Sequence, residues 1–198
     1  MPVTTRRYAY TYGDYLRLEA DAPSVRHEFV DGDILAMAGG SDLHSALIAA
    51  INGELYRELR GTPCGLRDSN LRVSVRATGN AFYADALVVC GEAEIVHEAR
   101  GGDSLLNPTV IIEVLSPSTE DYDRTQKFDD NYRYIPSLRE YLLVAQDEAA
   151  IEIRSRDEAG GWTSRAFGAR DQAPISSLGC SLDVDSVYRE ARKNMKPS

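Results

Sequence analysis

Residues 109–119 read TVIIEVLSPST, a run of apolar residues that Glu113 interrupts and that a polar turn closes. The β-branched residues indicate a buried strand, and the Ser-Pro-Ser turn leads into a helix expected over residues 120–134. Residues 81–90, AFYADALVVC, form a second apolar segment, and we expect one continuous strand there with Asp85 inside it. Each of these two predicted strands therefore carries one acid in an apolar setting.

The remaining segments predict helices and strands around this centre. Thr11 and Asp14 have the spacing of a capping box at the start of a helix. Apolar residues at every fourth position from Leu47 to Leu59 indicate a buried helix over residues 43–59. Further elements are expected as strands at 27–30 and 33–35 joined by an Asp-Gly turn, strands at 71–75, 140–145, 151–156 and 162–167, a loop at 91–107 and a helix at 184–193. This order predicts an α/β (α+β) fold with a central mixed sheet flanked by helices.

Composition limits the class of protein. The chain has 198 residues, of which 43% are hydrophobic and 27% charged, as in ordinary globular proteins. No linker or repeat divides it, which predicts a single domain over residues 1–198, with a core at about 11–190 and short flexible ends. The apolar runs are too short to span a bilayer, and no apolar block follows Arg6 and Arg7 as in a signal peptide. We therefore expect a cytoplasmic protein that does not bind membranes.

Charge and cysteine content exclude several kinds of site. The net charge of −9 counts against a broad nucleic-acid surface, because phosphate contacts need clustered Lys and Arg. The three cysteines are far apart and form no CxxC pair, so neither a zinc site nor a disulfide framework is indicated. We expect three reduced thiols.

Lys127 stands out among the basic residues. Of the 22 lysines and arginines, three are lysines, and Lys193 and Lys196 both lie in the C-terminal tail. Lysine is a compact charge whose pKa responds to its surroundings, and arginine does not replace it freely. The choice of lysine at this one central position is compatible with a specific role or with a chance surface residue.

Asp85 and Glu113 suggest a metal site. A buried ionised carboxylate costs several kcal/mol unless it is paired, hydrogen-bonded or bound to metal. Two acids in successive buried strands favour a shared divalent cation. On the helix that follows, Arg124, Lys127 and Asn131 share one face that could cover the acids. Two acids, a metal and a lysine suit phosphodiester hydrolysis, whereas the alternative is a solvated helix whose cations pair with its own acids.

The chain resembles the Uma family (Uma-two type) of predicted restriction endonucleases. The similarity spans about residues 11–190 and rests on Asp85, residues 112–119, Asp123, Lys127 and residues 140–144. The early hairpin at residues 27–34 and the following helix with His44 are also similar. The resemblance implies a PD-(D/E)xK restriction-endonuclease-like fold and a Mg²⁺-dependent site, with Mn²⁺ as a substitute. It also implies a homodimer that cleaves nucleic acid, with DNA as the favoured substrate.

The resemblance assigns roles residue by residue. Asp85 matches the aspartate of the family motif and Glu113 its second acid, and the backbone carbonyl of Val114 is the expected further metal ligand. Lys127 matches the catalytic lysine, which has moved from the strand to the next helix. Glu28 matches an early glutamate that contacts the metal or its water.

Two positions depart from the motif. Ala84 stands where the motif has proline, and Leu115 stands where its lysine usually lies. The first change affects a turn and removes no ligand. The second makes the site depend on Lys127 reaching across from the helix.

Substrate contacts and alternative functions complete the interpretation. Arg72, Arg76 and Arg124 are candidate substrate-binding residues, and the first two share a face if both lie on one strand. His44 is expected to be a packing residue, with a place in the site as the alternative. Two other functions stay open, namely an inactive interaction or regulatory module that keeps the fold and a metal-dependent hydrolase of small phosphates.

Overall fold

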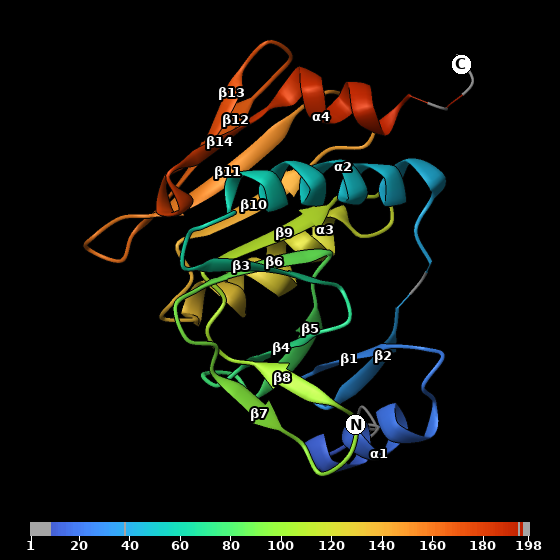
Figure 1. Ribbon diagram of the computed structural model, residues 1–198. Helices are drawn as coiled ribbons and strands as arrows, with labels where there is room; N and C mark the ends of the chain where they lie inside the picture. The colour runs from blue at the N-terminus through green and yellow to red at the C-terminus, as the bar shows by residue number, and fades with distance from the viewer. Residues whose placement is uncertain (1–8, 38, 194, 196–198) are drawn as a thin grey trace, which may run out of the picture.

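The computed structural model describes residues 9–37, 39–193 and 195, so part of the short ends predicted as flexible lies outside the described residues. It contains two six-stranded sheets with helices around them (Figure 1). Sheet I has the order β2 (Asp33–Ala36), β1 (His27–Val30), β5 (Asn80–Tyr83), β4 (Arg72–Val75), β8 (Asp103–Leu105) and β7 (Ile95–His97). Sheet II has the order β12 (Trp162–Phe167), β11 (Ile151–Arg156), β10 (Glu140–Val144), β9 (Val110–Val114), β6 (Ala86–Cys90) and β3 (Cys64–Asp68).

Sheet II is the predicted central mixed sheet, because β9 and β10 run parallel while its other pairs are antiparallel. Helices α2 (Asp42–Glu58) and α4 (Val184–Ala191) lie over one face (Figure 1). On the other face lies a helical segment made of α3 (Glu120–Tyr122), the π-helix η1 (Asp123–Asp129) and the 3₁₀ turn η2 (Tyr132–Tyr134). The remaining elements are α1 (Tyr12–Asp21), the hairpin β13 (Gln172–Ile175) and β14 (Cys180–Asp183), and the 3₁₀ turn η3 (Ser176–Leu178).

Alternate residues of sheet II face its two layers. Ile112 packs in the same cluster as Leu47 of α2, whereas Ile111 packs with Phe128 of η1. Side chains alternate along a strand, so Glu113 shares the face of Ile111 and points toward η1. The buried acid of the TVIIEV run thereby meets the helix that carries the lysine.

The predicted strand over residues 81–90 is wrong as a single element, because the chain bends at Ala84 and Asp85 and passes from sheet I to sheet II. Residues 80–83 pair with β1 and β4, and residues 86–90 pair with β3 and β9. The loop expected over residues 91–107 contains β7 and β8, and β3, β13 and β14 were also not predicted. Within the described residues, no helix is both long and apolar enough to cross a membrane.

Cys64 and Cys90 form a disulfide, which corrects the expectation of three reduced thiols. The antiparallel register of β3 and β6 places these two residues directly opposite each other, although they are 26 positions apart in sequence. Cys180 is a free thiol, as predicted. The pairing depends on a strand that the sequence did not reveal.

Asn131 fastens the helical segment to sheet I. It is 1% exposed, accepts hydrogen bonds from Thr78 Oγ1 at 2.7 Å and Asn80 Nδ2 at 2.9 Å, and donates to the Gln126 carbonyl at 2.7 Å. Asn131→Ala is expected to lower the free energy of unfolding by about 2–3 kcal/mol, because it leaves buried polar groups unpaired. Chemical denaturation measures this, with the exposed Asn70→Ala as control at roughly 0.5 kcal/mol or less. Equal losses in the two variants would contradict the assignment.

Candidate active site

A pocket of about 660 Å³ is lined by residues from both sheets, α2 and η1. It brings together the four predicted catalytic residues. Glu28 comes from β1, Asp85 lies just before β6, Glu113 is in β9 and Lys127 is in η1. The prediction that Asp85, Glu113 and Lys127 share one cavity is therefore confirmed, although the Asp85 side chain is partly exposed.

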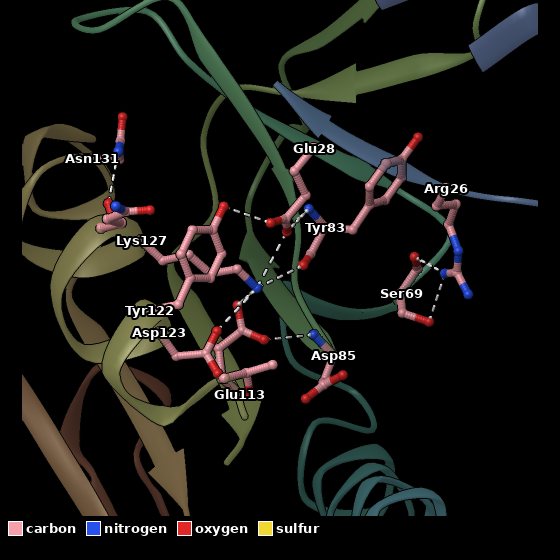
Figure 2. Close-up of polar contacts among 12 residues, drawn as sticks. Arg26, Glu28, Ser69, Tyr83, Asp85, Glu113, Tyr122, Asp123, Lys127 and Asn131 are labelled. Atoms are coloured by element: carbon pink, nitrogen blue, oxygen red, sulfur yellow. Dashed lines mark hydrogen bonds and ion pairs between the residues drawn. The ribbon is translucent and has the colours of Figure 1, made fainter. Parts of the chain in front are cut away.

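Lys127 lies at the centre of this group, as Figure 2 shows. Its ammonium Nζ is 3.1 Å from Glu113 Oε1, 3.2 Å from Asp123 Oδ1 and 3.3 Å from Glu28 Oε1. It also donates to the backbone carbonyl of Tyr83 at 3.3 Å. The side chain is 6% exposed, so the lysine is a buried cation enclosed by oxygen atoms and not a solvated surface charge.

Asp85 and Glu113 are held side by side by the backbone. The register of β6 and β9 pairs Ala86 with Ile112, which places the two acids next to each other at the end of that pairing. The Asp85 amide donates to Glu113 Oε2 at 3.3 Å, and Asp85 Oδ2 accepts a hydrogen bond from the Val114 amide at 2.7 Å. Asp85, just before β6, thus lies beside Glu113 of the neighbouring strand β9, close to the predicted arrangement.

The carboxylates outnumber the cation that they surround. Burial raises the pKa of Glu113 well above its usual value, and the charges of Asp123, Asp85 and Glu28 add to this while Lys127 opposes it. Burial likewise raises the pKa of Asp123. Although burial lowers the pKa of Lys127, the charges of Glu113 and Glu28 raise it well above its usual value. The lysine therefore keeps its proton at neutral pH. Because the carboxylates outnumber this one positive charge, the pocket favours the binding of a further proton or metal cation.

Glu113→Gln is expected to stabilise the metal-free protein at neutral pH. The pKa of Glu113 in the folded state lies above its reference value of 4.5, so the folded protein binds more protons than the unfolded chain. The stability of the wild type therefore falls as the pH rises from about 4.5, by up to about 1.4 kcal/mol per pH unit. Glutamine has no such slope. Thermal unfolding in EDTA between about pH 5 and pH 8 measures the difference, and parallel curves would contradict it.

The comparisons with known proteins identify the family. The model of the Uma2 family, described as "Putative restriction endonuclease", matches residues 12–185. The chain belongs to the Uma2 family. The restriction-endonuclease-like fold that the resemblance implied is also supported, because a crystal structure of a "putative nuclease belonging to DUF820" from Anabaena variabilis ATCC 29413 matches with a TM-score of 0.64. That match covers 83% of this chain and 90% of the other, at 16% identity.

Two relatives of this Uma2 chain come from Synechocystis sp. (strain ATCC 27184 / PCC 6803 / Kazusa). "Uncharacterized protein slr1290" is 33% identical over 89% of this chain and 90% of its own length. "Uncharacterized protein sll1609" is 32% identical over 74% of this chain and 80% of its own length. The similarity therefore extends over most of each protein.

The predicted substrate-binding role of Arg72 in this Uma2 chain is wrong. Arg72 is fully buried, and its guanidinium donates to Ser104 Oγ at 2.8 Å and to the carbonyls of Gly101 and Gly102 at 2.9 and 3.2 Å. Its donors are occupied within sheet I and the adjoining loop, so no phosphate reaches them. Arg72 joins β4 to the loop before β8.

The other two candidate arginines lie outside the pocket. The Arg76 guanidinium is 4.0 Å from a Glu94 oxygen at the end of β4, and its side chain is 74% exposed. Arg124 donates to Glu120 Oε1 at 2.8 Å and pairs with Glu152. Both side chains are thus near carboxylates, and neither lines the cavity that holds Lys127.

Three residues that line the Uma2 pocket were not assigned to the site from the sequence, although Asp123 carried part of the family resemblance and His44 was an alternative candidate. Asp123 is 3% exposed and lies four positions before Lys127, a spacing that indicates an ion pair. The hydroxyl of Tyr122 donates to Glu28 Oε2 at 2.8 Å, which no sequence pattern indicated. His44 lies 3.3 Å from Asp85 through Nε2 and lines the pocket, so the expected packing role is incomplete.

The donor atoms at this wall of the pocket suit a hard divalent cation. The Asp85 and Glu113 carboxylates and the Val114 carbonyl supply oxygen, the ligand that Mg²⁺ prefers. In the described part of the chain, no three His, Cys, Asp or Glu side chains are already grouped to hold a metal. A cation here would therefore take few side-chain ligands and complete its shell with water, as Mg²⁺ commonly does.

Proposed function

We propose that this Uma2 protein is a Mg²⁺-dependent endonuclease, with Mn²⁺ as a substitute, that hydrolyses phosphodiester bonds in nucleic acid, with DNA as the favoured substrate. The observation that carries the proposal is the buried lysine beside Glu113 and Asp85 in one open pocket. Purely structural acids in apolar strands would pair with arginines and would leave no cavity at the pair. The same arrangement argues against an inactive module, which has no need for buried carboxylates.

Each residue has a distinct part in the proposed reaction. Asp85, Glu113 and the Val114 carbonyl would hold the ion, which would supply charge neutralisation at the phosphoryl oxygens and a more acidic water molecule. Lys127 stays protonated, so its positive charge stabilises the negative charge that develops at the phosphoryl group, and it does not act as a base. Glu28 orients Lys127.

The charge of the pocket favours a second candidate, a hydrolase of small phosphates. Lys127 is the only lysine or arginine that lines the cavity among the described residues. The net charge of the chain is −9. A long polyanion gains most from clustered cations, whereas a small phosphate needs only the bound metal and one lysine.

Cleavage assays separate these functions. Supercoiled plasmid, linear duplex, single-stranded DNA and RNA are incubated with Mg²⁺, with Mn²⁺ and with EDTA, alongside nucleoside phosphates as small substrates. We expect metal-dependent cleavage of nucleic acid, with DNA cut fastest. Turnover of the small substrates alone would support the second candidate, and no turnover of any substrate would support the inactive module.

We further propose that the protein acts as a homodimer in the cytoplasm. One unit is small compared with a duplex, and two copies would present two sites to its two strands. The Cys64–Cys90 disulfide counts against this location, because a reducing cytoplasm keeps most thiols reduced. Light scattering measures the molecular mass in solution and so tests the homodimer. Thiol titration of protein isolated with its thiols blocked against oxidation measures whether Cys64 and Cys90 are reduced.

A further inference from the structure

The side chain of His44 lies in the pocket and not in the apolar core, where a residue with only a packing role would lie. It lies in the first turn of α2, after the N-cap residue Ser41, and its side chain is 17% exposed. The stripe of α2 that packs on sheet II includes Leu47 and Ile51, yet the imidazole turns into the polar pocket. Its partner there is the carboxylate of Asp85.

The imidazole faces two of the groups proposed as metal ligands. Its Nε2 lies 3.3 Å from Asp85 Oδ2. Val114 lines the same pocket, and its amide donates to that same Asp85 oxygen at 2.7 Å. A ring nitrogen that faces the Asp85 carboxylate beside Val114 lies where a ligand of a shared cation would be expected.

The backbone around His44 is shaped to keep the ring in place. A Cβ atom added at Gly40 would come within 2.6 Å of His44 Nδ1, so the absence of a side chain at Gly40 makes room for the imidazole. The Ser41 hydroxyl accepts a hydrogen bond from the His44 amide at 3.1 Å and donates to Gln146 at 2.7 Å. The start of α2 is therefore tied to the end of β10, close to the Val114 carbonyl.

We propose that His44 is a further metal ligand of this site through Nε2, in addition to Asp85, Glu113 and the Val114 carbonyl. The inference rests on the proposed metal-dependent function and extends it to the identity of the ion. Imidazole nitrogen binds Mn²⁺ and later transition metals better than Mg²⁺, which prefers oxygen. The site is consequently expected to bind Mn²⁺ more tightly than Mg²⁺, while either ion would support the proposed reaction.

Metal binding tests this without reference to catalysis. Calorimetry gives the affinities of Mn²⁺ and Mg²⁺ for the full chain, and pulsed electron paramagnetic resonance of bound Mn²⁺ detects a coordinated nitrogen. The wild type, labelled with ¹⁵N only in histidine, is expected to show the coupling of a ligating ¹⁵N nucleus. His44→Gln keeps a hydrogen-bond donor for Asp85 but removes the imidazole, so the ¹⁵N coupling disappears and the ratio of Mn²⁺ to Mg²⁺ affinity falls about 10- to 100-fold. The control His97→Gln, at an exposed side chain in β7, keeps both.

The outcomes distinguish this inference from the proposed function. Suppose that Mn²⁺ binding depends on Asp85 but the spectrum shows no ¹⁵N coupling from histidine. This result would overturn the role of His44 and would still support the metal site. Coupling that persists in His44→Gln would overturn it as well. No binding of either cation to the wild type would overturn both the inference and the metal dependence of the proposed function. The isotope experiment on the wild type stays decisive if a variant fails to fold.

Discussion

Replacing Asp85 with asparagine is expected to slow nucleic-acid cleavage by at least about 100-fold. Loss of a residue that only orients a metal ligand typically costs about 10- to 100-fold, so loss of a charged ligand costs at least as much. The folded state should persist, because the amide oxygen of asparagine still accepts the hydrogen bond from the Val114 amide. Initial rates of plasmid cleavage at saturating Mg²⁺, together with thermal unfolding, measure the two effects.

The matched control is Asp130→Asn, which makes the same change at an exposed position after η1. It should leave both cleavage and stability within experimental error. If Asp85→Asn cleaved at the wild-type rate, Asp85 would hold only the backbone of Val114, and the proposed metal site would lose its first ligand.

Lys127→Met is expected to abolish cleavage and to destabilise the protein by about 3–5 kcal/mol, as when one partner of a buried ion pair is removed. Methionine has nearly the length of lysine but no charge, so Glu28, Glu113 and Asp123 lose the cation that they share. Mg²⁺ should then raise the unfolding temperature of the variant more than that of the wild type. Denaturation with and without Mg²⁺ measures this.

Two further variants interpret that result. Lys193→Met makes the same change at an exposed residue of the C-terminal segment and should have no effect on either property. Lys127→Arg keeps the charge but places a broader group among oxygens that lie 3.1 to 3.3 Å from the ammonium, so it should still lose activity. Full activity in Lys127→Arg would reduce the role of Lys127 to charge balance.

The elements around the site follow from local patterns in the sequence. The capping box at Thr11 and Asp14, the four-residue period of α2 and the Asp-Gly hairpin all appear where they were predicted. The break between β5 and β6 could not be predicted. A continuous apolar run is compatible with a buried strand on either sheet, and only long-range pairing decides where the chain changes sheets.

The residues of the site were predictable only where the local sequence makes them unusual. Asp85 and Glu113 attract notice because an acid is costly in an apolar strand, whereas Asp123 lies in a polar helix where acids are common. The prediction for Arg72 was wrong because the sequence around an arginine does not show whether its guanidinium binds backbone carbonyls or is exposed to solvent. The contact between His44 and Asp85 joins residues 41 positions apart, and no local pattern encodes it.

The bend at Ala84 and Asp85 has a thermodynamic consequence for the whole molecule. Glu28 belongs to one sheet and Glu113 to the other, and Lys127 ties the two together. A ligand that competes for these carboxylates must change the strength of the ion pairs that Lys127 makes with them. Ligand binding is therefore coupled thermodynamically to the separation of the two sheets. The Tyr83 amide, which donates to Glu28 at 3.2 Å, is then an internal reporter, and its hydrogen-exchange rate should record whether the pocket is filled.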